Sequence, residues 1–144
     1  MSGSLLDFET SLVAPPLRGK LFRVDPFGLK PATPRPKRLS SQDLAELVDA
    51  AAAIGAVTPV LLDKKDRVLA GHGFVAVGTQ LELEDIPALC LYDLSLKEWE
   101  IYMISMAEYF RIGELSYKLF AEETHHIRTL WALASEYEAK KRAA

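Results

Sequence analysis

The segment VLAGHGFVAVG, residues 68–78, decides the fold because it joins a strand-like run to a helix-like run through Gly-His-Gly. The first run is short, apolar and rich in valine and leucine, as in a buried strand. After Gly73, the apolar residues of FVAVGTQL do not alternate strictly, which favours a helix of about two turns over another strand. The segment therefore predicts a strand that passes directly into a helix.

The residues before this segment predict one helix and a pair of short strands. Ser40 or Ser41 offers an N-cap, and apolar side chains recur at helical spacing up to Gly55, so we expect a helix from about 41 to 54. The runs PVLLD and RVLAG indicate two buried strands joined by the charged tight turn KKD. Residues 15–36 hold six of the eight prolines, which predicts an irregular segment with at most one short strand near LFRV.

The residues after the segment predict one more strand and two helices. The run IPALCLYDL indicates a strand with Pro87 at its beginning, where a missing backbone donor costs least. Ser95 caps a helix that Gly113 ends, and a last helix is expected over about 114–141. The predicted fold class is α+β, with a small mixed sheet, flanking helices and a helical C-terminal region.

Composition limits the class of protein. A chain of 144 residues suffices for one domain with its own core. The sequence has no apolar run long enough for a membrane span and its first residues lack the pattern of a signal peptide, so we expect a cytoplasmic protein without a membrane partner. Cys90 is the single cysteine, which excludes a disulfide framework or a cysteine-rich metal site within one chain, and we expect it to be a small buried residue.

The charge of the chain is uneven. Its formal net charge is −3, yet residues 17–38 carry seven basic side chains against one acidic side chain. Clustered Lys and Arg supply most of the sequence-independent affinity for phosphates, so this stretch could meet a nucleic acid or a nucleotide. The alternative is a solvated arm stiffened by proline. The overall acidity argues against a dedicated high-affinity DNA-binding domain.

The last predicted helix carries two Glu-x-x-His pairs, Glu122 with His125 and Glu123 with His126. This i, i+3 spacing projects two ligands toward a metal in di-iron bundles, but such sites need another Glu-x-x-His motif from a second helix and further carboxylates from other helices. His125 and His126 also lie about 100° apart around a helix. We therefore expect no metal site, and a polar helix face is the favoured interpretation.

The Gly-His-Gly turn is the strongest candidate for chemistry, with two interpretations left open. The first turn of a helix has unpaired N–H donors and a positive dipole end, and glycines without a Cβ let an anion approach closely. Gly71 and Gly73 fit that geometry, and His72 could donate to a phosphate or carry a proton near neutral pH. Alternatively the turn is merely structural, with His72 an exposed cap residue.

Taken in order, these segments resemble the N-terminal domain of the ParB/sulfiredoxin-like superfamily over about residues 21–112. The corresponding stretches are FRVDPFGLKP and TPRPKR, then GAVTPVLLD, then VLAGHGFVAVGTQL, then IPALCLYDLS. The resemblance implies a flexible N-terminal arm over residues 1–20, a ParB/sulfiredoxin-like domain over 21–112 and a C-terminal helical extension over 113–144. The most similar subgroup is the one with a Gly-His-Gly-Arg turn.

The resemblance implies a phosphate-handling turn whose polar partners are altered. ParB proteins bind and hydrolyse CTP there, other branches are described as nucleases or kinases, and sulfiredoxins use a cysteine in the turn to activate a sulfinic acid. Gly71, His72 and Gly73 match the subgroup, but Phe74 stands where the motif has arginine. An aromatic ring supplies neither the charge nor the donors of a guanidinium. Met106 and Ala107 likewise replace Asp and Asn, which suggests a degenerate site.

Three functions follow from the residues and the resemblance. The first is a nucleotide- or DNA-phosphate-binding domain, with CTP or another nucleotide and Mg as possible ligands. The backbone amides of Gly71 to Phe74 and the His72 imidazole would bind the phosphate, Arg35 or Lys37 would supply charge, and catalysis would be weak or absent. The second is a non-enzymatic adaptor whose C-terminal helices bind a protein partner or a second copy. The third is a nuclease or nucleotide triphosphatase, for which Asp63, Asp66 and Glu108 are the candidate bases.

Overall fold

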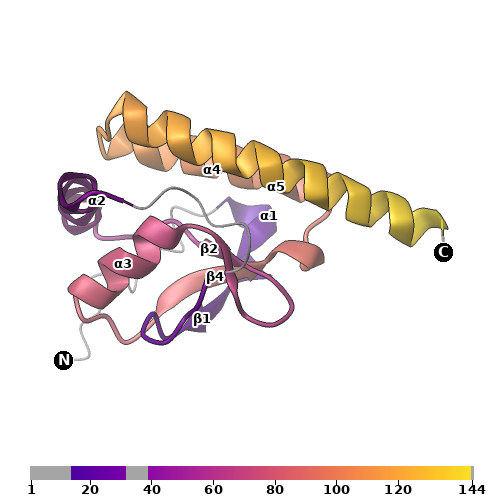
Figure 1. Cartoon of the computed structure of the whole chain (residues 1–144), viewed down its shortest axis with the longest axis horizontal. Helices are drawn as coiled ribbons and strands as arrows, with labels where there is room; N and C mark the ends of the chain where they lie inside the picture. The colour runs from indigo at the N-terminus through magenta and orange to yellow at the C-terminus, as the bar shows by residue number, and fades with distance from the viewer. Residues whose placement is uncertain (1–13, 32–38, 144) are drawn as a thin grey trace.

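The computed structural model describes residues 14–31 and 39–143, and its centre is a mixed four-stranded sheet (Figure 1). Its strands lie in the order β1-β4-β2-β3, with β2 parallel to β4 and the other neighbours antiparallel. The α+β class with a small mixed sheet is therefore confirmed. The strands are β1 (Phe22–Val24), β2 (Val60–Leu62), β3 (Val68–Ala70) and β4 (Ile86–Cys90).

The buried strands are those that the apolar runs predicted. Every residue of β2 and β3 is buried, as expected for strands that read as continuous apolar runs. Pro87 lies inside β4 opposite Arg23, one residue before the parallel pairing with β2 begins at Ala88. A proline is tolerated there because this end of the strand needs fewer ladder hydrogen bonds. Cys90, expected to be buried, is half-buried at the end of β4.

The helices begin and end close to the predicted residues because their caps are local signals. The Ser40 hydroxyl accepts a hydrogen bond from the Asp43 N–H at 3.0 Å, and Gly55 ends the same helix with a left-handed φ of 81°. Ser95 and Glu98 form a reciprocal capping box at the start of the next long helix. The helices are α1 (Pro15–Arg18), α2 (Ser41–Ile54), α3 (His72–Gln80), α4 (Leu96–Ile112) and α5 (Tyr117–Ala143), with a 3₁₀ turn η2 (Leu91–Asp93).

Several boundaries differ from the sequence prediction. The strand expected over IPALCLYDL ends at Cys90, and Leu91–Asp93 form the 3₁₀ turn η2 instead. Helix α3 begins at His72, so Gly73 lies inside the helix and not in the turn. Helix α5 begins at Tyr117 instead of 114, because the chain first turns through Glu114, whose φ is 51°. The described part of the predicted N-terminal arm contains the short helix α1, which starts with prolines at its first positions and buries Leu17.

Helices α4 and α5 lie side by side over the sheet, and α5 extends past it toward the C-terminus (Figure 1). Helix α2 packs against α3, whereas α5 reaches β3 at the edge of the sheet. The core between α4 and α5 is aromatic, with Trp99 edge-to-face against both Tyr102 and Trp131. Among the described residues no helix is both long and apolar enough to cross a membrane.

Candidate phosphate-binding turn

The turn between β3 and α3 is formed by Gly71, which has a left-handed φ of 90° and ψ of 21°. Its carbonyl accepts the first helical hydrogen bonds, from the Phe74 N–H at 2.9 Å and the Val75 N–H at 3.1 Å. Gly71 is the N-cap residue and has no side chain with which to cap the helix. The Phe74 amide is therefore committed to the helix, and the amides left to face an anion are those that precede it.

Packing also explains why both flanking residues are glycines. A Cβ on Gly71 would lie 2.9 Å from Val60 Cγ1 and 3.1 Å from Val60 Cα, on the neighbouring strand β2. A Cβ on Gly73 would lie 2.7 Å from Leu47 Cδ1 and 3.0 Å from Leu39 Cδ1. The two glycines thus allow the turn to pass β2 closely and allow α3 to pack on α2. Ligand approach is not needed to account for them.

His72 is half-buried, so the interpretation as an exposed cap residue is wrong. Its ring lies edge-on against the ring of His126 from α5, with centroids 5.9 Å apart and an interplanar angle of 67°. The imidazole therefore occupies the boundary between the start of α3 and the helix that covers it. The residue as a whole is half-buried, but both ring nitrogens are shielded from solvent.

The Glu123–His126 pair faces inward, contrary to the expected polar helix face. His126 is 8% exposed and its Nε2–H donates to the Leu69 carbonyl of β3 at 2.5 Å. Burial raises the pKa of the Glu123 carboxyl, whereas His126 and the backbone N–H of Gly71 act in the opposite direction. Its neighbour His125 is exposed. The described residues hold no group of three or more His, Cys, Asp or Glu placed to bind a metal ion.

The positions where the resemblance expects polar groups belong to the apolar core. Phe74 is 2% exposed and packs edge-to-face against Tyr109 and Phe110, with ring centroids 5.3 and 6.3 Å apart. Met106 is 5% exposed. These side chains form packed hydrocarbon, which provides no donor to a phosphate. Arg35 and Lys37 lie outside the described residues.

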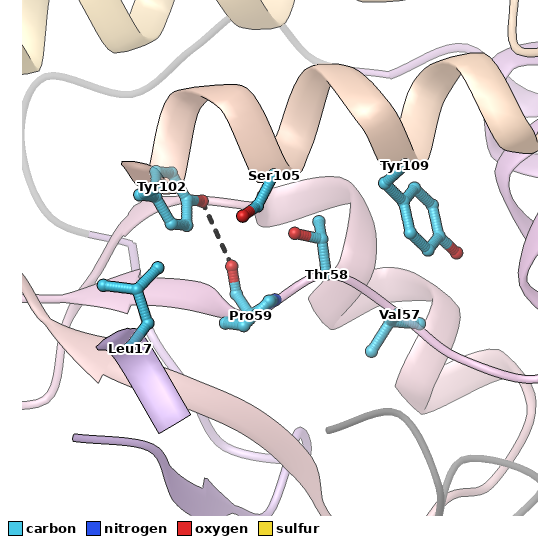
Figure 2. A pocket seen from close by; sticks show the side chains of 7 residues that line it. All are labelled: Leu17, Val57, Thr58, Pro59, Tyr102, Ser105 and Tyr109. Carbon is cyan, nitrogen blue, oxygen red and sulfur yellow. Dashed lines mark hydrogen bonds between the residues drawn. The ribbon is translucent and has the colours of Figure 1, made fainter. Parts of the chain in front are cut away.

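A small pocket between α1, the segment before β2 and α4 carries hydroxyl groups from Thr58 and Ser105 (Figure 2). The Tyr102 hydroxyl donates to the Pro59 carbonyl at 3.1 Å beside it. Burial raises the pKa of Tyr102 far above its usual range, so this phenol stays protonated. The cavity volume is about 10 Å³, enough for roughly one water molecule and not for a nucleotide.

Two of the three candidate bases of the nuclease hypothesis, Asp63 and Glu108, have structural partners. The Asp63 carboxylate accepts from the backbone N–H groups of Lys65 at 2.8 Å and Arg67 at 2.9 Å, and from Arg67 Nε at 2.8 Å. Glu108 pairs with Arg111 one turn along α4. Asp66 lies in the same turn as Asp63, with a φ of 57°. Asp63 therefore braces the hairpin between β2 and β3.

Replacing Asp63 by asparagine is expected to lower the free energy of unfolding by about 1–2 kcal/mol at pH 7. Burial alone would raise the pKa of this carboxyl, but the amides of Arg67 and Lys65 and the Arg67 guanidinium outweigh it and hold the pKa below its usual value. A carboxyl whose pKa is lower in the folded state stabilises the fold at pH values above its pKa in the unfolded state. That stabilisation is lost as the pH falls through its pKa in the folded state. Urea denaturation of both proteins should show the difference shrinking below about pH 4. A constant difference down to pH 2 would contradict this account.

A comparison with known proteins finds a ParB-like relative. The ParB-like nuclease domain-containing protein YnaK of Escherichia coli (strain K12) is 31% identical over 67 residues, which cover 46% of this chain and 77% of that protein. The chain belongs to the ParB-like family. No model of a protein family matches it. The word nuclease in the name of YnaK describes that protein and not this chain.

Proposed function

We propose that this ParB-like chain binds a phosphate group, of a nucleotide such as CTP or of DNA, at the turn 71–74, with weak or no catalysis. The supporting observation is the N-terminus of α3, which starts at a left-handed glycine without a capping side chain and has His72 as its first residue. Such a helix terminus combines unpaired donors with the positive end of the helix dipole. Weak or absent chemistry is proposed because Phe74 and Met106 are apolar and buried.

The test is a thermal-shift titration with CTP, ATP, GTP, their diphosphates and short duplex DNA, each with and without magnesium. A ligand at 100 times its Kd stabilises the folded state by about 2.7 kcal/mol, which raises Tm by several degrees. We expect one nucleotide to produce a saturable rise. We expect His72→Ala to reduce that rise by at least half, because His72 is the first residue of α3 and the proposal assigns its imidazole to the phosphate.

His125→Ala is the matched control, since this histidine is exposed on α5 and should leave the shift unchanged. Arg35→Ala tests whether the basic arm adds charge to the site. No saturable shift with any of these ligands would count against phosphate binding. An equal shift in the wild type and the His72 variant would remove the imidazole from the site.

A non-enzymatic adaptor is the second candidate, and a groove between α4 and α5 favours it. The groove has a volume of about 280 Å³ and is lined by Glu100, Met103, Arg128 and Trp131. Its apolar floor and charged edges are typical of protein interfaces. Helix α5 also extends past the sheet in Figure 1. This candidate requires association with a protein partner or with a second copy of the chain. Sedimentation velocity at micromolar concentration measures self-association.

A further inference from the structure

The N-terminus of α3 is covered by α5, although the two helices lie far apart in sequence. His126 fastens α5 to the end of β3 through its hydrogen bond to the Leu69 carbonyl, two residues before the turn. The same ring contacts His72 at the start of α3. A ligand at the first amides of α3 would therefore lie beside α5.

Glu123 lies three residues before His126 and therefore on the same face of α5. This face is directed toward the connection between β3 and α3. Its Oε1 atom is shielded from solvent and has no hydrogen-bond partner among the described residues. The backbone N–H of Gly71 interacts with this carboxyl. A buried polar atom without a partner lowers stability by roughly 1–3 kcal/mol. An apolar side chain at position 123 would avoid this loss.

We infer that the Glu123 side chain occupies the phosphate position at the N-terminus of α3, so that a phosphate ligand must displace it and loosen α5. This inference rests on the proposed phosphate binding at the turn. A carboxyl oxygen and a phosphate oxygen accept from the same backbone donors, and both cannot hold one N–H group at once. When both are ionised they also repel each other across a site with little water.

The displacement would couple ligand binding to the exposure of α5. The hydrogen bond from His126 to Leu69 and the contact between the two histidine rings lie beside Glu123, so movement of Glu123 weakens the attachment of this part of α5. Helix α5 also forms one wall of the groove with Met103 and Trp131. The turn would then control the surface that the adaptor candidate uses.

The experiment measures binding of inorganic pyrophosphate by isothermal titration calorimetry to four full-length proteins: the wild type, E123A, E123Q and E122Q. We expect E123A to bind at least tenfold more tightly than the wild type, because both the bulk and the charge of the competitor are removed. E123Q removes only the charge and should fall between the two. E122Q loses the same charge one residue away, about 100° around the helix, and should match the wild type.

Equal affinity in all four proteins overturns the inference and leaves phosphate binding at the turn intact. No detectable binding by any of them, E123A included, overturns the proposed function together with the inference. Thermal unfolding of each variant establishes that it is folded, and E123Q decides the comparison if the smaller E123A side chain destabilises α5. Hydrogen exchange adds a second readout, because pyrophosphate should speed amide exchange in α5 of the wild type, and unchanged exchange with bound pyrophosphate would overturn the displacement.

Discussion

Replacing Gly71 by alanine is expected to lower the free energy of unfolding by about 2–5 kcal/mol, the sum of two separate costs. The backbone there has a φ of 90°, and a left-handed conformation costs an L-residue roughly 1–2 kcal/mol. The new Cβ would also lie 2.9 Å from Val60 Cγ1 and 3.1 Å from Val60 Cα. Val60 is fully buried in the sheet, and such overpacking costs about 1–3 kcal/mol. Urea denaturation with unchanged m-values measures the loss.

Three other glycines separate the two costs. Gly28 has a φ of 86° with nothing within 4 Å of a built Cβ, so Gly28→Ala should show the backbone cost alone. Gly73→Ala should show only steric overlap, because its close neighbours are the ends of leucine side chains and its φ is not left-handed. Gly19→Ala meets open space and should be close to neutral. If Gly71→Ala is no worse than Gly28→Ala, the contact with Val60 relaxes freely and only the backbone conformation requires glycine.

The elements that the sequence predicted correctly are those whose signals are local. Ser40, Gly55 and Ser95 cap helices through contacts within a few residues of themselves, so their positions can be read without knowledge of the fold. The strands β2 and β3 were found because both are short, apolar and joined by a charged turn. Helix α1 was missed, because two prolines favour an irregular arm unless they occupy the first helical positions.

The surroundings of the turn could not be predicted in the same way. The spacing of Glu123 and His126 singled out the pair, but their partners, Gly71 and Leu69, lie more than 50 residues earlier in the chain. Only the packing of α5 against β3 brings them together, and helical periodicity does not say which strand a face will meet. The spacing was therefore interpreted as a failed metal motif on a polar face, whereas the structure uses it to attach α5 beside the turn.

The glycines illustrate a related limit. A ligand that approaches closely and a strand that packs closely both exclude a Cβ, so Gly-His-Gly is compatible with either cause. Close packing accounts for both glycines, because a Cβ would meet Val60 of β2 at Gly71 and Leu47 of α2 at Gly73. Sequence reasoning could identify the turn and its conformational demand. It could not identify which contacts impose that demand.

Replacing Phe74 by arginine, the residue that the resemblance expects at this position, is expected to destabilise the protein by at least about 4 kcal/mol, enough to unfold a domain of marginal stability. Phe74 is 2% exposed, and its ring meets Tyr109 and Phe110 edge-to-face. Removing a buried Phe side chain alone costs about 3–5 kcal/mol. The guanidinium would add an unpaired charge to an apolar core, which raises the cost further. Circular dichroism during thermal and urea unfolding measures the effect.

Two control substitutions make this result specific. Phe74→Leu keeps an apolar side chain and should cost far less than the arginine, while Gln80→Arg adds the same charge to an exposed position of α3 and should change stability by less than about 0.5 kcal/mol. A folded Phe74→Arg variant with wild-type stability would mean that the long side chain escapes from the core toward the turn. In that case its affinity for pyrophosphate should rise above that of the wild type, because the guanidinium could donate two hydrogen bonds to a phosphate bound at the first amides of α3. Loss of folding would instead show that this position belongs to the core. An arginine at position 74 would then require changes at Tyr109 and Phe110 as well.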